Sequence, residues 1–530
     1  MAFFNSRLGL LGCFAILFMT CAGVLADVKM PSVFSDNMVL QRDIPLNIWG
    51  WAAPGEKVTV SFAGQTVTAD TDKDGNWAVK FTPVAMNKNP QDLKVAGKNT
   101  LAFKNVLVGD VWVCSGQSNM AMVVVSCLNA KQEVDSSANP LIRQIKMNNV
   151  ISLYPKNDIS GSAWVVASPR TTGGFTAAGY FFAREIVKET GVPVGLINTS
   201  WGGTKIEPWT SREGFKKVPE LKKILEQVDS WIPTTEAGKK SFFKYIEDMK
   251  AWMPVAEAAV NEGKMPQPAP VMAGLTNTHS QPTMIFNAMV SPIIKYGIKG
   301  ALWYQGESNG GEGISYAHKM NALISGWREL WGQGDFPFYF VQLANFQTSN
   351  PDNAAGADGW SRCREAQLKT LSMVPNTGMA VIMDIGEVSD IHPKDKQDVG
   401  KRLAACALAK DYGKNNVMSG PLYKSFKVEG DKIKVSFDHI GGGLVAGEKD
   451  FLAPFKETSG AGLKSFAIAG ADKKWYWADA AIDGDSVIVS SKNVSKPVAV
   501  RYAFSMNPPQ GVNFYNKEGF PASPFRTDSW

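Results

Sequence analysis

From about Val28 to Asn105 the chain consists of short runs in which apolar and polar residues alternate. The runs include NIWGW, KVTVSF and AVKF, and Gly, Asp or Pro separates each run from the next. Alternation with a period of two is typical of strands that bury one face, and the intervening turn formers favour antiparallel hairpins. We therefore predict a small β-sandwich-like domain over residues 27–107.

Near Val108 the pattern changes to apolar strand-like runs that alternate with longer helix-like segments. Strand candidates such as VPVGLINTS, KGALWY, FPFYFVQL and TGMAVIMDIG are almost wholly apolar, and amphipathic segments such as TAAGYFFAREIVKET lie between them. This is the pattern of a parallel sheet that is covered by helices on both faces. Residues 108–415 are therefore predicted to form a three-layer α/β domain.

Two segments depart from this alternation. Residues 211–280 are charged and helix-like through PELKKILEQVDSW and KSFFKYIEDMKAWM, and they contain the proline-rich run KMPQPAP. This helical insertion either borders a site at the strand ends or decorates the surface. Residues 416–530 return to short alternating runs, such as DKIKVSF, DSVIVSS and PVAVRYAF, which predict a C-terminal β domain.

The composition is that of a folded globular protein with several domains, since 45% of the 530 residues are hydrophobic and 20% are charged. The formal net charge of +6 is spread along the chain without a run of five or six basic residues. Nucleic acid is therefore not an expected partner. Beyond the N-terminus we find no span apolar enough to cross a bilayer, so stable membrane insertion is not expected either.

The N-terminus predicts a secretory signal peptide over residues 1–26. Arg7 precedes the apolar run LGLLGCFAILFMTCAGVLA, and small residues stand just before a cleavage point at Asp27. A permanent membrane anchor is disfavoured because the run is short, and a lipid anchor on Cys13 or Cys21 has weak support. We expect an exported protein, either periplasmic or extracellular.

Four cysteines follow residue 26, and none of them has the paired C-x-x-C spacing of a zinc site: Cys114, Cys127, Cys363 and Cys406. Export permits disulfides, but four cysteines in a chain of this size do not define a disulfide scaffold. The sequence does not fix whether any of them pair.

The run VWVCSGQSNM at residues 111–120 places Ser118 at a predicted turn from strand to helix. A nucleophilic serine occupies such a turn, and a following helix would add amides and a dipole that favour an oxyanion. A simple helix cap is the alternative, because Ser and Asn are preferred capping residues. The tetrapeptide alone does not decide between the two.

Four histidines make the candidates for a general base easy to count. Two of them lie in predicted regular elements, which favours structural or surface roles: His318 and His439. His279 follows the helix-like segments of the insertion, from where it has access to the site. His392 follows an apolar strand, with Asp390 two residues before it, and α/β sheets build their sites at such strand ends. A triad of Ser118, His392 and Asp390 is therefore predicted.

Two further polar segments follow predicted strands. Residues 201–204 read WGGT, and their paired glycines let backbone N–H groups turn toward a ligand. Residues 305–309 read QGESN and combine side-chain amides with a carboxylate. Four polar loops that each follow a core strand are hard to explain by helix capping alone.

The blocks GQSNM, SWGGTKIEPW, WYQGESN and DIHP, in this order, resemble the four blocks of the SGNH hydrolase superfamily. The version is that of sialate O-acetylesterases and related bacterial carbohydrate acetylesterases. FSDNMVLQRDIPLNIWGWAAPGEKV, REAQ and NKEGFPASPFRTD also resemble that family, so the resemblance covers nearly the whole chain after residue 26. It implies an SGNH-type hydrolase domain, flanked by the two β domains, that attacks acetyl esters with a serine.

The resemblance also implies roles for single residues. It makes Ser118 the nucleophile and His392 the base, and it builds an oxyanion hole from the amides of Ser118 and Gly203 and a side-chain amide of the third block. The family's usual Gly-x-Asn-Asp is replaced here at residues 306–309, so the side-chain donor must be a neighbouring amide, that of Gln305 or Asn309.

The fourth block departs from the family pattern as well, because Asp390 stands two residues before His392 rather than three. The group that orients the histidine is therefore left open among Asp390, Glu387, Glu307 and a backbone carbonyl. Candidates for substrate contacts are Gln117, Glu307, Lys205 and Arg364.

An exported carbohydrate O-acetylesterase that acts on O-acetylated sialic acids is the function this resemblance implies. A xylan or xyloglucan acetylesterase is the close alternative. A non-catalytic carbohydrate-binding protein is the alternative of another class, since indole rings stack on sugars and the chain has 16 tryptophans. An acidic sugar requires a cation, for which the candidates are Lys205, Arg362 and Arg364. No metal ion or organic cofactor is expected, because hydroxyl, imidazole and amide groups suffice for acyl transfer.

Overall fold

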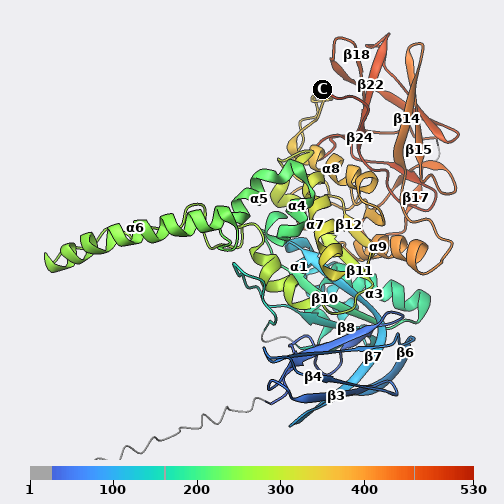
Figure 1. Cartoon of the computed structure of the whole chain (residues 1–530). Helices are drawn as coiled ribbons and strands as arrows, with labels where there is room; N and C mark the ends of the chain where they lie inside the picture. The colour runs from blue at the N-terminus through green and yellow to red at the C-terminus, as the bar shows by residue number, and fades with distance from the viewer. Residues whose placement is uncertain (1–26, 160–162, 459) are drawn as a thin grey trace, which may run out of the picture.

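A computed structural model describes residues 27–159, 163–458 and 460–530, so the predicted signal peptide lies outside the described residues. The chain has a mixed α/β fold with one large mixed sheet and several smaller β sheets. This confirms the expected fold class at that level (Figure 1). In the part of the chain that the structure describes, no helix has both the length and the apolar character that crossing a bilayer requires.

One 17-residue strand, β7 (Thr100–Gly116), joins the N-terminal β region to the central sheet. Its first half pairs antiparallel with β6 (Asn87–Ala96), and its second half pairs parallel with β10 (Val194–Ser200) and β11 (Gly300–Tyr304). Burial alternates along the first half and is continuous from Val106 onward, in step with the change of sequence pattern. The boundary expected after residue 107 falls inside this strand, and the division into domains stays a prediction.

The other N-terminal strands form hairpin-like antiparallel pairs, as the alternating pattern predicts. β3 pairs with β4 and β6, β2 pairs with β5, and the short β1 runs parallel to β7. Their bounds are β1 (Val39–Gln41), β2 (Leu46–Trp51), β3 (Lys57–Phe62), β4 (Gln65–Asp70) and β5 (Asn76–Phe81).

Six parallel strands form the centre of the large sheet in the order β13-β12-β11-β7-β10-β8, with β9 antiparallel at the β8 edge. The chain builds β8 and β10 on one side of β7 and then crosses to β11, β12 and β13 on the other. β7 and β11 are neighbours whose connections leave in opposite directions, and such a switch point opens a crevice at the strand ends. The remaining bounds are β8 (Asn139–Lys146), β9 (Val165–Ala167), β12 (Phe338–Val341) and β13 (Thr377–Ala380).

Helices pack against both faces of these parallel strands. On β7, Trp112 belongs to a core shared with α3 (Ala177–Thr190) and α9 (Lys396–Asp411), whereas its neighbour Val113 belongs to the core shared with α7 (Ser315–Trp331) and α8 (Gly359–Met373). Successive side chains of a strand point to opposite faces, so burial of both faces explains the nearly continuous apolar runs.

The insertion at 211–280 is helical, as its sequence predicts. It contains α4 (Arg212–Lys217), α5 (Lys222–Asp229) and the 26-residue α6 (Glu236–Asn261), which projects from the body as an arm (Figure 1). The chain then returns along the arm, since the Trp252 indole donates to the Gln267 carbonyl oxygen at 2.9 Å. The two remaining short helices near the sheet are α1 (Ser118–Ala121) and α2 (Ala130–Asp135).

The C-terminal region forms three antiparallel sheets, of orders β14-β15-β21-β20, β17-β16-β23 and β19-β18-β22-β24. Arg364 of α8 joins this region to the central sheet, because its guanidinium donates to the carbonyl oxygens of Ser505 and Met506. The strands are β14 (Leu422–Glu429), β15 (Lys432–Asp438), β16 (Leu444–Glu448), β17 (Lys456–Glu457), β18 (Phe466–Gly470), β19 (Trp475–Trp477), β20 (Asp479–Asp483), β21 (Ser486–Ser490), β22 (Pro497–Tyr502), β23 (Phe514–Asn516) and β24 (Phe525–Arg526).

Candidate active site

Ser118 and His392 face each other, although 274 residues separate them in the sequence. The Nε2 atom of His392 lies 2.9 Å from the Ser118 Oγ, and the Nδ1 atom of the same ring lies 3.0 Å from Asp390 Oδ1. Ser118 follows β7 and His392 lies in the loop between β13 and α9, so both stand at the carboxyl ends of parallel strands. The geometry is that of a nucleophile, a base and an orienting carboxylate.

A tight turn at the end of β7 presents Ser118. Gly116 has a φ of +135°, and a Cβ atom there would stand 2.2 Å from the Tyr304 carbonyl oxygen, so only glycine fits between β7 and β11. The next residue, Gln117, donates its N–H to that same carbonyl oxygen at 3.0 Å. The helix expected behind the serine is the single turn α1, so a helix dipole of any length is absent there, which corrects that expectation.

Asp390 is the carboxylate that contacts the histidine ring, among the three acids that the sequence leaves open. It also accepts the His392 backbone N–H at 2.9 Å, and this hydrogen bond is the main reason that the pKa of Asp390 is lowered. Glu387 instead accepts the backbone N–H of Lys394 at 2.9 Å. Glu307 contacts Asn119 rather than the imidazole.

Replacement of Asp390 by asparagine is expected to lower kcat by roughly 10- to 100-fold. The loss is smaller than for a buried triad aspartate, because Asp390 is 38% exposed and water partly replaces its charge. Steady-state hydrolysis of an aryl acetate measures the effect, with Glu387→Gln as the matched control that leaves the histidine contact intact. A larger loss for Glu387→Gln than for Asp390→Asn would assign the orienting role to the wrong carboxylate.

A buried hydrogen-bond network of Lys396, Asn119 and Glu307 holds the loop that carries His392. The Lys396 ammonium donates to Asn119 Oδ1 at 2.8 Å and to the Pro393 carbonyl oxygen at 2.5 Å. The Asn119 amide donates to Glu307 Oε1 and to the Ile391 carbonyl oxygen, at 2.5 and 3.0 Å. The carbonyl groups of Ile391 and Pro393, on either side of His392, are therefore linked to Asn119. The first link is direct, and the second runs through Lys396.

Burial shifts the pKa values of Lys396 and Glu307, the two ends of this network, in the direction that favours their neutral forms. It lowers the pKa of Lys396 to about 8 and raises the pKa of Glu307. The second carboxylate oxygen of Glu307 is buried and has no hydrogen-bond partner among the residues that the structure describes. Lys396 and Glu307 therefore compensate each other through Asn119, and loss of either one would leave a buried charge alone.

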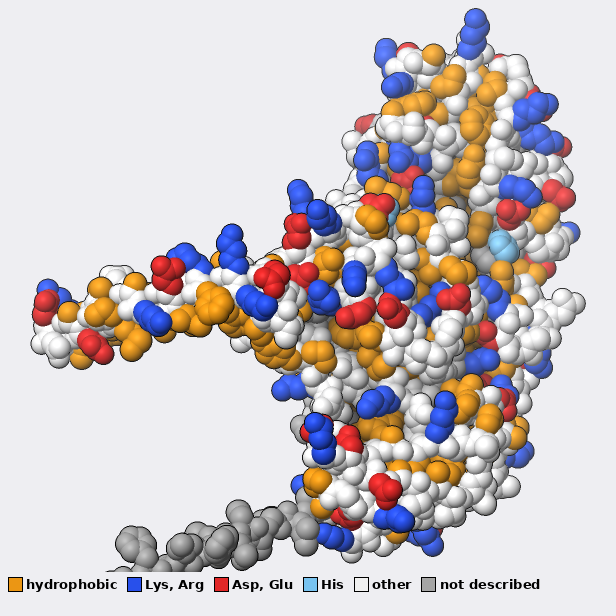
Figure 2. Space-filling view, in the orientation of Figure 1, with side chains coloured by type: hydrophobic (Ala, Val, Ile, Leu, Met, Phe, Trp, Pro, Cys, Tyr) orange, Lys and Arg blue, Asp and Glu red, His pale blue; other side chains and the backbone are white. Residues whose placement is uncertain are grey.

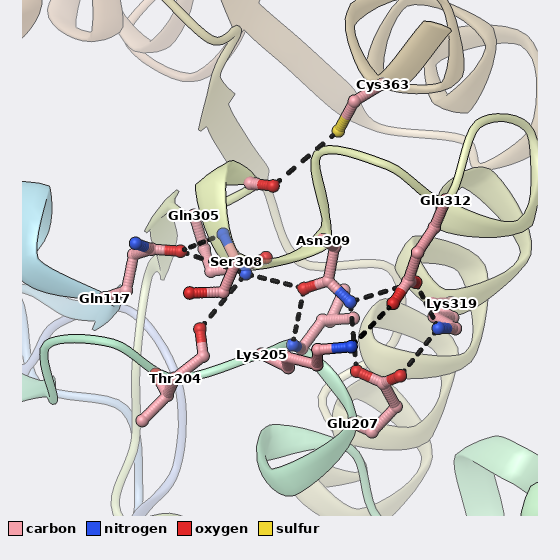
Figure 3. Close-up of polar contacts among 12 residues, drawn as sticks. Gln117, Thr204, Lys205, Glu207, Gln305, Ser308, Asn309, Glu312, Lys319 and Cys363 are labelled. Atoms are coloured by element: carbon pink, nitrogen blue, oxygen red, sulfur yellow. Dashed lines mark hydrogen bonds and ion pairs between the residues drawn. The ribbon is translucent and has the colours of Figure 1, made fainter. Parts of the chain in front are cut away.

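A second polar network, shown in Figure 3, joins the loops after β10 and β11. The Gln305 amide nitrogen lies within hydrogen-bond distance of Gln117 Oε1, the Thr204 carbonyl oxygen and Asn309 Oδ1. The Asn309 amide nitrogen donates to two carboxylates, Glu207 at 3.1 Å and Glu312 at 3.0 Å. Lys319 of α7 in turn contacts both of these carboxylates.

These contacts bear on the predicted side-chain donor of the oxyanion hole. Gln305 and Asn309 are both buried, and each amide N–H group already faces an acceptor inside the network. The geometry therefore makes them supports of the loop and does not favour either as an oxyanion donor. Gln117 is buried too, and its side-chain oxygen accepts from Gln305 and from the Ser308 backbone, which holds the first block to the third.

The turn after β10 lies directly against the serine. A Cβ atom on Gly202 would stand 3.4 Å from the Ser118 Cβ, and Gly203 has a φ of +74° with open space around it. Glycine permits this left-handed turn. An oxyanion role for the Ser118 and Gly203 amides stays a prediction, and this proximity is consistent with it.

Two predicted substrate contacts have different outcomes in the structure. Lys205 is 48% exposed and pairs with Glu312 at 3.1 Å, so its ammonium stays accessible. Arg364 is fully buried, and its guanidinium donates to four backbone carbonyls. The prediction that Arg364 contacts substrate is therefore wrong, because helix α8 points this side chain into the core.

The C-terminal end of the insertion reaches the site. The ring of His279 stacks on the indole of Trp201, the residue before Gly202, with ring centroids 5.3 Å apart and planes 18° from parallel. The insertion thus borders the loop beside the serine, as one of the two interpretations of its sequence expected. Its histidine contacts Trp201 rather than Ser118.

Sequence reasoning missed the roles of Asn119 and Lys396. Asn119 lies inside the quoted GQSNM block, but its partners are 188 and 277 residues away. Lys396 carried a usable signal, because it is the first residue of α9, where an acidic side chain would suit the helix dipole better. A cation at that position indicates an interaction outside the helix.

Comparison with known proteins agrees with this geometry. A family model described as carbohydrate esterase, sialic acid-specific acetylesterase, matches residues 108–232 and 274–409. A novel carbohydrate acetylesterase from Xanthomonas citri has a similar structure, with a TM-score of 0.77 and 35% identity over 95% of this chain and 100% of that chain. Fold and site together are therefore those of a carbohydrate esterase.

Two curated relatives narrow this class. Sialate O-acetylesterase of Rattus norvegicus is 31% identical over 437 residues, which cover 76% of this chain and 77% of the relative. Sialate O-acetylesterase of Mus musculus is 28% identical over 546 residues and covers 94% of both chains. The chain belongs to the sialate O-acetylesterase family. It is an esterase, so the alternative of a non-catalytic carbohydrate-binding protein is dropped.

Proposed function

We propose that this chain is an exported carbohydrate O-acetylesterase that cleaves acetyl esters through an acetyl-enzyme intermediate on Ser118. The domain that carries Ser118 and His392 is, in this proposal, an SGNH-type hydrolase domain. The observation that carries the proposal is the 2.9 Å contact between Ser118 Oγ and His392 Nε2, at the switch point of a parallel sheet. The signal-like residues 1–26 support export.

The first half of the reaction forms the acetyl-enzyme. The His392 Nδ1–H donates to Asp390, which leaves Nε2 unprotonated toward the serine. The Ser118 Oγ attacks the acetyl carbonyl while Nε2 takes its proton, and the amides of Ser118 and Gly203 bind the oxyanion. His392 then gives the proton to the sugar oxygen, and the C–O bond to the sugar breaks.

The second half releases acetate. A water molecule gives a proton to His392 and attacks the acetyl carbonyl carbon on Ser118. The tetrahedral intermediate collapses, and the same proton returns from His392 to the serine oxygen. Each turnover consumes one water and gives acetate and a free sugar hydroxyl.

O-acetylated sialic acid is the favoured substrate, and the family model and the two named relatives support this choice. A plant polysaccharide such as xylan or xyloglucan is the second candidate. The carbohydrate acetylesterase of Xanthomonas citri, 35% identical to this chain, supports an acetylated carbohydrate as substrate and is compatible with both candidates. The two substrates differ in charge, since sialic acid carries a carboxylate.

Lys205 provides a test of that difference. Its exposed ammonium lies in the loop beside Ser118, so Lys205→Met is expected to lower kcat/KM for O-acetylated sialic acid about 10-fold and to leave a neutral acetylated xylan oligosaccharide unchanged. Lys217→Met is the control, because Lys217 is a similarly exposed, paired lysine on α4. Faster acetate release from xylan than from sialic acid by the unmodified enzyme would reverse the order of the two candidates.

A further inference from the structure

The arm formed by α6 and the returning chain exposes an unusual number of apolar side chains. Of nineteen large hydrophobic residues that are exposed among the described residues, seven lie between residues 243 and 271: Phe243, Ile246, Met253, Val255, Val260, Met265 and Val271. Figure 2 shows apolar side chains gathered along the arm. Folded monomers seldom expose apolar side chains in such a group. The family match leaves residues 233–273 out, so the catalytic site does not account for them.

Four of these side chains follow a helical repeat along α6. Phe243 and Ile246 are three residues apart, and Met253 and Val260 continue from Ile246 at intervals of seven. The positions that complete the same stripe hold Lys250 and Glu257, and Lys239 precedes it by four residues. A repeat of alternating three and four residues forms the seam along which two helices pack.

The chain's own return segment covers a different side of α6. Ala256 is buried and Trp252 bonds to the returning Gln267, whereas Phe242 and Tyr245 pack against the core around Trp231 at the base of the arm. Within the described residues, the stripe from Phe243 to Val260 is left uncovered, with Phe243 70% and Val260 61% exposed. Figure 1 shows that the arm stands clear of the body, so a partner has access along it.

We propose that the stripe on α6 binds the same stripe of a second copy of this chain, with the two helices antiparallel. A two-fold axis level with residue 248, on the side of the helix that carries the stripe, pairs residues whose numbers add to 496. Phe243 of each copy then lies on Met253 of the other, and Lys239 faces Glu257. From Lys239 to Glu257 the stripe is thus complementary to itself in shape and in charge, as a symmetric interface requires, and Val260 at its end lies opposite Glu236.

The register leaves few charges unpaired. Ile246 meets the aliphatic part of Lys250, whose ammonium extends to water. Lys239 makes an exposed ion pair with Glu236 in its own chain, and such pairs exchange partners at little cost. The two bodies lie at opposite ends of the paired arms, because each α6 leaves its body at the N-terminal end.

The size of the contact sets the expected strength. A helix of 26 residues is about 39 Å long, and a contact one helix diameter of about 10 Å wide covers roughly 400 Å² per copy. Stable dimers usually bury about twice that area per copy. We therefore expect a reversible dimer whose population rises with concentration.

Sedimentation velocity of the purified full-length protein, from about 1 to about 100 µM, tests the proposal. The unmodified chain should shift from monomer to dimer over this range, and Phe243→Glu with Met253→Glu should stay monomeric. Val255→Glu is the matched control, because Val255 is 63% exposed but lies about 200° around the helix from Met253, so its dimer should persist. All variants should keep aryl acetate hydrolysis, because none of these residues lies at the site.

A charge exchange tests the register itself. Lys239→Glu should weaken the dimer at least 10-fold, and addition of Glu257→Lys should restore it. The proposal is overturned if the unmodified chain remains monomeric at the highest concentration, or if the exchange fails to restore the dimer. It is also overturned if Phe243→Glu with Met253→Glu abolishes binding to anionic phosphatidylglycerol vesicles and leaves the sedimentation unchanged, since the stripe would then bind lipid.

Discussion

Replacement of Ser118 by alanine is expected to lower acetate release by at least about 10⁴-fold, because it removes the atom that attacks the ester in the proposed mechanism. Residual activity should come from binding and from the oxyanion donors alone. The fold should persist, since the lost hydroxyl contacts a partly exposed imidazole and its removal leaves no buried polar group unpaired. Acetate release from an aryl acetate, together with the thermal unfolding temperature, measures both parts.

Ser115→Ala supplies the matched control in the same segment. Ser115 is buried in β7 three residues before the nucleophile, and its hydroxyl has no hydrogen-bond partner among the described residues. Its removal should leave kcat unchanged and stability equal or slightly higher. An active Ser118→Ala enzyme, or a Ser115→Ala enzyme as inactive as Ser118→Ala, would contradict the assignment of the nucleophile.

Replacement of Lys396 by methionine is expected to have the largest effect on stability, a loss of about 3–5 kcal/mol. Methionine fills a similar volume, but it leaves the Glu307 carboxylate without its compensating charge and the Pro393 carbonyl without its donor. The loop that carries His392 loses its attachment to Asn119, so kcat should also fall, by roughly 10- to 100-fold. Urea unfolding and steady-state kinetics on the folded enzyme separate the two effects.

The double variant Lys396→Met with Glu307→Gln tests whether charge compensation is the cause. It removes both buried charges and keeps the hydrogen-bonding shape of Glu307. We expect it to be more stable than Lys396→Met alone, so the two changes should be strongly non-additive. Additive losses would show that Lys396 and Glu307 act independently.

Stability should also depend on pH through Lys396. Burial lowers its pKa from 10.5 to about 8, so between these values the unfolded chain binds more protons than the folded chain. The contribution of Lys396 to the free energy of unfolding therefore increases as pH rises through that window. From pH 8 to about pH 10 the unmodified protein should gain stability relative to the double variant, and a constant difference between them would contradict this.

Much of the architecture follows from the residue pattern. The period of 3.6 predicts α3 close to its observed ends, and continuous apolar runs predict β10, β11 and β12. The sequence pattern did not predict β8, because Arg143 and Lys146 interrupt its apolar run. The Arg143 side chain is nevertheless buried, since its guanidinium donates to the Asn37 carbonyl oxygen and to the backbone and side-chain oxygens of Asn105.

The site was predictable to the level of the motif and no further. The motifs predicted that Ser118, His392 and Asp390 lie together, and the structure has His392 in contact with both of the others. This was predictable because the strand ends of a parallel sheet lie at one edge. The direction of each side chain is not encoded in a short motif. Arg364 therefore looked like a substrate contact although α8 turns it into the core, and the Gln305 amide faces its own network.

Mass spectrometry of the enzyme quenched during turnover of an acetyl ester tests directly whether Ser118 carries the acetyl group. We expect that one peptide, containing Ser118, gains the mass of a single acetyl group, and that this gain disappears in Ser118→Ala. An acetyl group on another residue, or turnover without any acetylated peptide at the earliest quench times, would contradict it.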